Sequence, residues 1–405
     1  MYNKKQPKHI FYYTSIIMSY YLLPEIHTYI DKLHLQSSQE DNLYVSFTLN
    51  NYLNNIKKQI DENYENWDYM KRYTNPHEFI HTIVPNTKYS VSKLKPLSRS
   101  FYKMVELVNM FSLFDNFVSE SINTFHLAEG PGGFIEATNF MRNNTLDTYY
   151  GMTLINDDPN VPGWKKTSSF LESHPNIQIE YGATGTGDLL DVENLKYCNN
   201  KYKNSMNIIT ADGGFDFSID FNQQEMLASN LLLAQVSFAI SMQKIGGHFI
   251  MKIFDIFTKT TCDILYLLST LYKQVYIVKP FTSRMANSEK YVVCKGFKKY
   301  PDALIKNIIS NYSILKTAPF ISGILGFKLD YFYINKIEEY NAIFGQQQIE
   351  NIGATLNLMN CKNKNDRLET MKKNNIQKCI QWCEKNHIIY NKNMIQTNIF
   401  TFNVV

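Results

Sequence analysis

Short β-rich segments alternate with helical segments from about residue 124 to residue 272, and this alternation limits the fold more than any other feature of the sequence. The predicted strands cover residues 124–129, 149–154, 177–182, 207–213 and 247–253, and the predicted helices cover residues 132–141, 223–244 and 258–272. Such alternation builds βαβ units, in which helices cover both faces of one sheet of parallel strands. The sequence therefore predicts an α/β fold with a doubly wound, mainly parallel sheet.

Two further strands, residues 274–280 and 290–297, end this region without a helix between them. Strands that are joined by a short loop pair antiparallel. A doubly wound sheet that ends in an antiparallel hairpin is the architecture of class I (Rossmann-like) methyltransferases. A plain dinucleotide dehydrogenase would lack the hairpin.

We expect three regions in the 405 residues. Residues 1–95 are predicted to form a helical extension, residues 96–300 the sheet domain, and residues 301–405 a helical region of unknown role. The apolar run 10–23 contains four Tyr and no small-residue cleavage site follows it, so a partly buried helix is favoured over an export signal. The run 231–242 is shorter than the roughly 20 residues of a membrane span, so no membrane association is expected.

Positive charge is concentrated between residues 79 and 105, although the net charge of the chain is only +4. This segment contains no Asp or Glu but holds Lys88, Lys93, Lys95, Arg99 and Lys103. A segment of this kind can follow the phosphate backbone of a nucleic acid. A solvated surface without a ligand is the alternative interpretation.

The six cysteines lack the spacing of a disulfide framework, which favours a reducing, intracellular compartment. Cys379, Cys383 and His387 are spaced to share one helical face, and Cys361 is a candidate fourth ligand for zinc. An ordinary helix is the favoured alternative, and no metal is expected.

The segment from Ala128 to Phe134 (AEGPGGF) follows a predicted strand and opens a predicted helix. In this context glycines let the backbone approach a ligand closely, and the helix N-terminus attracts a carboxylate of the ligand. The loop lacks the Lys-Ser/Thr of a phosphate-binding loop and the spacing of a dinucleotide loop. A purely structural turn remains the alternative.

Three acidic residues follow the next strands, at the sheet edge where ligands of open α/β sheets bind. Asp188 is a candidate partner for an adenine amino group, and Asp157 or Asp158 for ribose hydroxyls. Surface carboxylates without a ligand are the alternative.

Four charged residues are predicted to meet at the same edge. Asp212 ends a strand, and Lys252 lies in the next, strongly apolar strand, where burial of a lysine is costly without a partner. Glu289 begins the last strand, and Lys103 precedes the first. A structural ion pair is the alternative for each residue taken alone.

Methyl transfer to a ribose 2′-OH requires such a set, because the hydroxyl is a poor nucleophile and its proton must be accepted or oriented. A lysine can act as general base when burial and a neighbouring cation lower its pKa. Lys252 is predicted to be this base, with Lys103 as the neighbouring cation. Asp212 and Glu289 would hold Lys252 in place, and alignment of the hydroxyl with the methyl would supply most of the acceleration.

Three long stretches resemble the FtsJ-type cap-specific mRNA 2′-O-methyltransferases. They are Ala211-Asp212-Gly213-Gly214-Phe215, LLLAQVSFAISMQKIGGHFIMKIFD and KPFTSRMANSEKYVVCKGF. Trp67 and Asn75-Pro76-His77-Glu78 also resemble the segment that precedes the catalytic domain in this family, and the similarity covers roughly residues 67–300. The resemblance implies a domain at residues 96–300 that methylates capped RNA with S-adenosylmethionine.

The resemblance also implies roles for individual residues. Lys103, Asp212, Lys252 and Glu289 correspond to a catalytic Lys-Asp-Lys-Glu tetrad. The implied cofactor contacts are Ser98, Leu127, Ala128, Glu129, Gly130, Pro131, Gly132, Gly133 and Asp188. Asn222 and Asn287 match positions that touch the RNA, and Arg284 lies in the same loop. Other capping or transcription proteins are candidate partners.

The sequence departs from the family at several places. Glu129 stands where many relatives have a small residue, and residues 156–169 and 301–405 have no recognised counterpart. The pocket for the cap guanine is not assigned, and its candidates are aromatic residues near the basic segment, such as Tyr89 and Tyr102. Methylation of ribosomal or transfer RNA, or an inactive RNA-binding subunit, are the alternative functions. Whether the first or second nucleotide is methylated, and whether the setting is viral or cellular, stays open.

Overall fold

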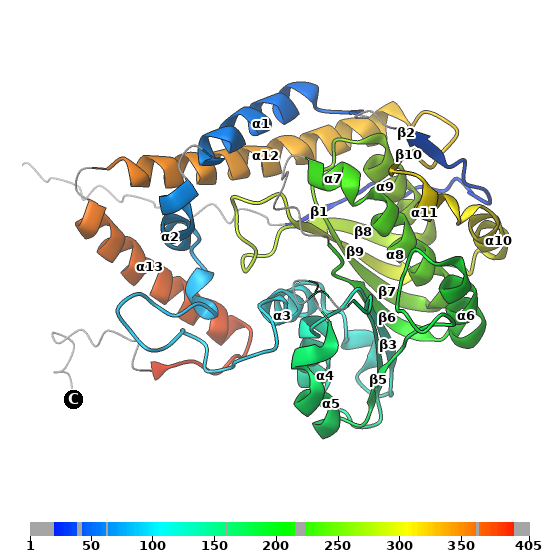
Figure 1. Cartoon of the computed structure of the whole chain (residues 1–405), viewed down its shortest axis with the longest axis horizontal. Helices are drawn as coiled ribbons and strands as arrows, with labels where there is room; N and C mark the ends of the chain where they lie inside the picture. Colours follow the sequence, from blue (N-terminus) through cyan, green and yellow to red (C-terminus); the bar gives the residue numbers. More distant parts are fainter. Residues whose placement is uncertain are drawn as a thin grey trace, which may run out of the picture.

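The computed structural model describes residues 20–38, 43–61, 64–156, 158, 161, 163–214, 223–361 and 364–392. An eight-stranded sheet with the order β1-β8-β9-β7-β6-β3-β4-β5 lies at the centre of the described part (Figure 1). Its strands are β1 (Tyr20–Leu22), β3 (Asn123–Leu127), β4 (Thr148–Met152), β5 (Ile177–Ile179), β6 (Met206–Ala211), β7 (Gln243–Ile253), β8 (Tyr272–Val278) and β9 (Lys290–Phe297).

The sheet is parallel from β5 to β7 and antiparallel at its other end. β5, β4, β3, β6 and β7 are parallel neighbours, and β9 pairs antiparallel with both β7 and β8. The predicted α/β class, the parallel sheet and the terminal hairpin are confirmed. This Rossmann-like arrangement brings the carboxyl ends of β3, β6 and β7 to one edge, where ligands bind in open α/β sheets.

Helices cover both faces of the sheet. They are α3 (Ser100–Phe111), α4 (Gly133–Arg142), α5 (Ser168–Ser173), α6 (Val192–Tyr202), α7 (Gln224–Leu227), α8 (Ser229–Met242), α9 (Lys259–Leu271), α10 (Asp302–Asn311) and α11 (Ile314–Thr317), with short 3₁₀ helices η1 (Glu78–Ile80), η2 (Asp115–Phe117) and η3 (Trp164–Lys166). The helix predicted over 223–244 is thus divided into α7 and α8, and residues 243–244 already belong to β7.

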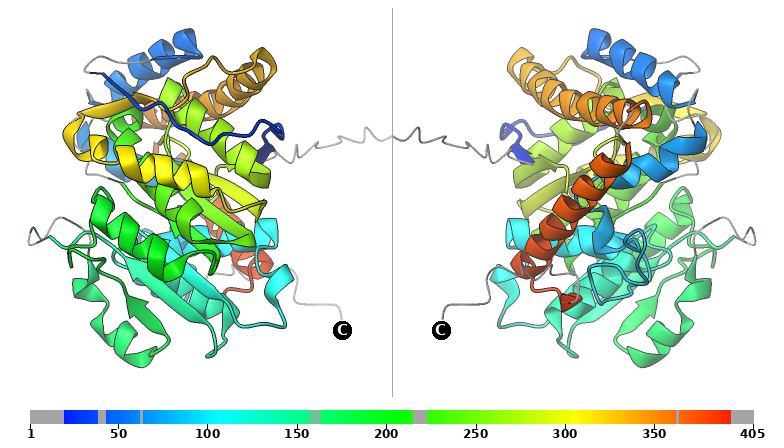
Figure 2. Two further views of the ribbon diagram at one scale, coloured as in Figure 1. Left: turned by 90° about the vertical axis from the view of Figure 1, so that its right-hand side faces the viewer. Right: turned by 90° about the vertical axis from the view of Figure 1, so that its left-hand side faces the viewer.

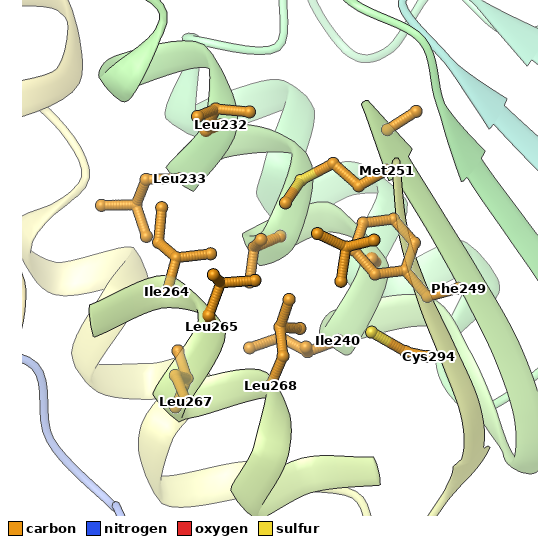
Figure 3. Close-up of a cluster of buried hydrophobic side chains, with 14 of the residues drawn as sticks. Leu232, Leu233, Ile240, Phe249, Met251, Ile264, Leu265, Leu267, Leu268 and Cys294 are labelled. Carbon is orange, nitrogen blue, oxygen red and sulfur yellow. The ribbon is translucent and has the colours of Figure 1, made fainter. Parts of the chain in front are cut away.

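Alternate side chains of the central strands pack into two separate cores. Ile209 of β6 and Phe249 of β7 belong to the core under α8 and α9, whereas Ile208 and Ile250 belong to the core under α3 and α4. Figure 3 shows side chains of α8 and α9 gathered against β7 and β9. Because both faces of the sheet are buried, the positions of the strand ends are firmly determined.

The two terminal regions pack against each other and against the domain. Their elements are β2 (Gln36–Ser38), α1 (Phe47–Asp61), α2 (Tyr64–Thr74), β10 (Phe320–Gly323), α12 (Tyr331–Met359) and α13 (Lys364–Lys385). Figure 1 shows α12 beside α1, and the right-hand view of Figure 2 shows α13 crossing obliquely below α12. β2 from the N-terminal region pairs antiparallel with β10 from the C-terminal region.

These regions differ in part from the prediction of mainly helical extensions. Residues 20–22, which were expected in a helix, form β1 and pair with β8, because backbone groups at the open edge of β8 accept another strand. Residues 10–19 of that predicted helix lie outside the described residues. Within the C-terminal region that was predicted to be helical, residues 331–359 and 364–385 form α12 and α13. None of the described helices is long and apolar enough to cross a bilayer.

Candidate active site

Lys103 lies in α3 and forms an ion pair with Glu289, the residue directly before β9. Its ammonium nitrogen lies 2.7 Å from Oε1 and 2.8 Å from Oε2 of Glu289. Lys103 is buried, and burial lowers its pKa although the charges of Glu289 and Asp212 act in the opposite direction. A bidentate ion pair therefore joins two predicted site residues that are far apart in the sequence.

Asp212 and Lys252 form the second pair of the predicted tetrad. Asp212 follows β6, and Lys252 lies in the parallel neighbour β7. Nζ of Lys252 donates a hydrogen bond of 2.7 Å to the backbone oxygen of Asp212 and lies 3.4 Å from its Oδ1. The two side chains are 14% and 16% exposed, so a substrate can reach them from solvent.

Tyr291, which no sequence pattern indicated, connects the Lys103–Glu289 pair to the Asp212–Lys252 pair. Its hydroxyl donates to Oδ1 of Asp212 at 2.8 Å and accepts from Nζ of Lys103 at 3.4 Å. Tyr291 also faces Lys252 across the pairing of β7 and β9. Burial, together with the carboxylates of Asp212 and Glu289, raises its pKa, so the phenol stays a hydrogen-bond donor.

Glu289 is held in its ionised form. Burial raises the pKa of this carboxyl, but the charges of Lys103 and Lys252 and a 2.6 Å hydrogen bond from the hydroxyl of Ser283 outweigh burial and lower it. Lys279 donates to the backbone oxygen of Glu289 at 2.7 Å and fixes the chain at this point. The structure thus brings Lys103, Asp212, Lys252 and Glu289 into one network.

The predicted cofactor loop connects Leu127, the last residue of β3, to α4. The backbone is left-handed at Ala128 (φ 50°) and Gly132 (φ 109°), and the Gly130–Pro131 peptide bond is cis. A Cβ on Gly133 would lie 2.2 Å from the hydroxyl oxygen of Ser98. Only glycine permits this approach, so Ser98 and the loop form one continuous surface.

Glu129 changes the expectation for this loop. Its Oε1 accepts hydrogen bonds from the amides of Phe134 (2.7 Å) and Ile135 (3.0 Å), so the first turn of α4 already binds a carboxylate of the chain itself. Oε2 is buried and has no hydrogen-bond partner in the described part of the chain. Burial raises the pKa of Glu129 to about 8, despite those two amides.

Asp188 lies in the loop that follows β5. Its Oδ1 accepts from the amide of Leu190 at 2.8 Å, and Oδ2 lies 3.3 Å from Nζ of Lys316. The carboxylate is therefore held by its own loop and by the C-terminal region. Asp158 is exposed, and Asp157 lies outside the described residues.

The predicted RNA contacts have different positions. Arg284 makes two hydrogen bonds, of 2.6 and 3.0 Å, to the carboxylate of Glu78, which is buried. Asn287 is exposed, and its side-chain oxygen accepts from Lys279 at 3.0 Å. Asn222 lies outside the described residues. The pairing of Glu78 with Arg284 places the Asn75–Glu78 segment beside the loop between β8 and β9.

The structure also places the candidate stacking tyrosines and the cysteines of α13. Tyr102 is 1% exposed and donates to the backbone oxygen of Leu94 at 3.0 Å, so it cannot stack on a guanine, whereas Tyr89 is exposed. Cys379 and Cys383 are buried in the core, where burial raises the pKa of both thiols. No group of ligands suited to a metal occurs among the described residues.

Residues 96–297 match the family model for FtsJ-like methyltransferase. The chain is similar to cap-specific mRNA (nucleoside-2′-O-)-methyltransferase 1 of Mus musculus, with 38% identity over 42% of this chain and 20% of that protein. The protein of the same name from Homo sapiens is 39% identical over 42% of this chain and 21% of that protein.

A second kind of relative matches a longer part of the chain. Cap-specific mRNA (nucleoside-2′-O-)-methyltransferase 2 of Danio rerio is 27% identical over 79% of this chain and 44% of that protein. The chain thus matches from a fifth to less than half of the length of these three relatives.

Proposed function

Because residues 96–297 of this chain are an FtsJ-like methyltransferase domain, we propose that it transfers a methyl group from S-adenosylmethionine to a ribose 2′-OH near the 5′ cap of mRNA. The observation that supports this function most directly is the buried network of Lys103, Asp212, Lys252 and Glu289 beside a glycine loop. The relatives named above support the choice of capped RNA as substrate. Such a substrate implies an intracellular setting.

The residues around the loop fit S-adenosylmethionine. The proposed contacts are Ser98, Leu127, Ala128, Glu129, Gly130, Pro131, Gly132, Gly133 and Asp188. Gly133 leaves room for close approach to the backbone, and Glu129, which is buried as an acid without the cofactor, would lose its proton and bind a positively charged group of the cofactor through Oε2. The cofactor would supply the electrophilic methyl group.

Lys252 is proposed to act as the general base. As the bond between the 2′ oxygen and the methyl carbon forms and the bond from sulfur to that carbon breaks, the hydroxyl proton passes to Nζ of Lys252. The carbonyl and carboxylate of Asp212 hold Nζ in place. Lys103 and Glu289 form the second ion pair of the network, and Tyr291 connects it to Asp212.

The RNA contacts are proposed at Asn222, Arg284 and Asn287. Arg284 shares its guanidinium with Glu78, so part of its role is to hold the loop between β8 and β9 in place. Asn287 is exposed at the tip of the same loop and is available to a substrate.

The test uses S-adenosylmethionine labelled in its methyl group with RNA of one sequence, either capped or uncapped. We expect label on the ribose of the first or second nucleotide of the capped RNA alone. Equal labelling of uncapped RNA would refute the cap assignment, and preferential labelling of ribosomal or transfer RNA would favour the alternative enzyme class.

The variant Lys252→Met tests the proposed base. We expect a loss of about 10²- to 10⁴-fold in kcat, the usual contribution of a general base. Lys244→Met is the matched control, because Lys244 lies in the same strand but is exposed to solvent. Full activity of the Lys252 variant would exclude this residue as the base and leave the fold assignment intact.

A further inference from the structure

A cavity of about 470 Å³ lies between α3, α13 and the loop that follows β8. Among its lining residues are His77, Phe281, Lys378, Gln381, Trp382 and Lys385. None of these belongs to the proposed tetrad or to the cofactor loop. The cavity therefore lies at the contact between the catalytic domain and the C-terminal region. The sequence did not indicate a role for that region.

One face of α13 gives the cavity its charge. Lys378, Gln381 and Lys385 are spaced three and four residues apart, so their side chains project from the same side of the helix. Both lysines are exposed, and neither forms a recorded ion pair within the described ranges. The two lysines thus lie about two helical turns, roughly 10 Å, apart along one side of α13, over a concave surface, and their long side chains can reach phosphates of one RNA strand.

Side chains next to this row on α13 fix the helix to the domain. The indole nitrogen of Trp382 donates to Oε2 of Glu106 at 3.1 Å, and the side-chain nitrogen of Asn375 donates to the backbone oxygen of Tyr73 at 2.7 Å. Cys379 and Cys383 are buried between these contacts. The two lysines are therefore carried by a rigid element, which limits the entropy lost when they bind a ligand.

The acid-free segment 79–105 continues this positive surface. The amide of Lys93 donates to the backbone oxygen of Ile389 at 3.0 Å, and the amide of Asn391 donates to that of Val91 at 2.9 Å. Lys93 and Lys95 are exposed beside the chain that leaves α13. The basic segment that the sequence singled out thus lies next to the cavity.

The wall opposite α13 is aromatic and leads to the tetrad. The rings of His77 and Phe281 lie with their centroids 5.4 Å apart. Glu106, which lies one helical turn after Lys103 in α3, accepts from the amide of Phe281 at 2.7 Å. The cavity and Lys103 of the tetrad are thus attached to the same helix, α3, which also holds Phe281 in place.

We propose that this cavity and the adjacent basic segment bind the RNA chain next to the ribose that is methylated. Lys378 and Lys385 contact phosphates of one RNA strand, and the pair of His77 and Phe281 offers a stacking surface for a base. The proposal rests on the proposed function for its ligand class. Under this proposal, α13 takes part in binding the RNA substrate.

The test compares two double variants in a fluorescence-anisotropy titration with a labelled, capped single-stranded RNA. Lys378→Glu/Lys385→Glu changes the cavity, and Lys372→Glu/Lys373→Glu makes the same change of charge on α13 outside the cavity lining. For single strands each phosphate contact contributes about 0.7 to the slope of log K against log salt. Loss of two contacts therefore reduces the steepness of this slope by about 1.4. Relative to 1 M salt, that difference corresponds to about 25-fold weaker RNA binding at 0.1 M salt.

We expect that loss for the cavity variant, less than a threefold change for the control variant, and unchanged binding of S-adenosylhomocysteine by both. The kcat at saturating RNA should stay within twofold, since α13 does not contact the tetrad. Neutral Lys378→Gln/Lys385→Gln removes the same two contacts without adding negative charge, so its loss should be about 25-fold and that of the Glu variant at least as large.

Equal RNA affinity of the two double variants would overturn the proposal, and would leave the cavity to a protein partner. The result is separable from the proposed function. RNA binding that depends on the two lysines, in a protein that methylates no capped RNA, would refute the function and support the binding surface.

Discussion

Glu129 offers the sharpest physical test of the site, because the charge of a single buried carboxyl should make stability depend on pH. Burial raises its pKa from an ordinary 4.5 to about 8. The folded protein therefore holds this proton more tightly than the unfolded chain. As a result the free energy of unfolding should fall as pH rises from about 4.5 to about 8, and level off above that range.

The size of the effect follows from the pKa difference. At about 1.4 kcal/mol for each pKa unit, the decline amounts to at most about 5 kcal/mol. The Glu129→Gln variant keeps an oxygen for the amides of Phe134 and Ile135 and removes the ionisation. Its amide nitrogen takes the unpaired position of Oε2 at any pH, so only the change with pH reports on the charge.

The assay is urea unfolding at pH 5, 7 and 9, followed by tryptophan fluorescence. The difference in unfolding free energy, variant minus wild type, should become more positive by about 4 kcal/mol between pH 5 and pH 9. Glu193→Gln is the control, because Glu193 is exposed and its one ion pair among the described residues is with Lys196. A difference that stays constant from pH 5 to pH 9 would refute the view that Glu129 is buried as an acid.

Three further predictions concern other contacts. Tyr291→Phe removes the hydroxyl between Asp212 and Lys103, so steady-state kinetics should show kcat reduced about tenfold, and urea unfolding a loss of about 1 kcal/mol. Gly133→Ala places a methyl 2.2 Å from the hydroxyl of Ser98, so calorimetry should show loss of cofactor binding in a folded protein. Arg284 and burial act in opposite directions on Glu78, and Arg284 prevails and lowers its pKa to about 2. The stability from this pair should be complete above about pH 5 and lost as the pH falls toward 2, and Glu78→Gln should remove that acid dependence.

The alternation of strands and helices predicted most of the sheet, because strands buried on both faces are apolar along their whole length. The short strands β1, β2 and β10, of three or four residues, were not predicted. A segment of three or four residues is too short to show an alternating hydrophobic pattern. It becomes a strand only because an unpaired strand lies beside it in the fold. In the terminal regions the neighbour is β8 for β1, and β2 and β10 for each other.

The same limit applies to the site. The order of the strands placed Asp212 beside Lys252, since adjacent parallel strands end at one edge. Lys103 and Glu289 were assigned only through a resemblance, because no local pattern connects positions 186 residues apart. Tyr291 was missed although it lies two positions after Glu289, on the side of the chain that faces the tetrad.

The ion pair of Arg284 with Glu78 could not be predicted from the sequence. Its loop matched an RNA-binding segment, and the sequence offered no reason to pair it with a carboxylate 206 positions upstream. The buried partner Glu78 appears only once α2 and η1 pack beside the loop. Tyr102 was likewise proposed as a stacking residue because it lies in a basic segment, whereas one side of that segment is core.

The pairing of β1 with β8 also affects how the molecule can be shortened. Tyr20, Tyr21 and Leu22 pair with Val278, Ile277 and Tyr276, which are three of the seven residues of β8. A chain trimmed to the family match would leave this edge of the sheet open to β8 of another molecule. We therefore expect the isolated domain to self-associate through β8. In the full chain β1 prevents this by occupying part of that edge.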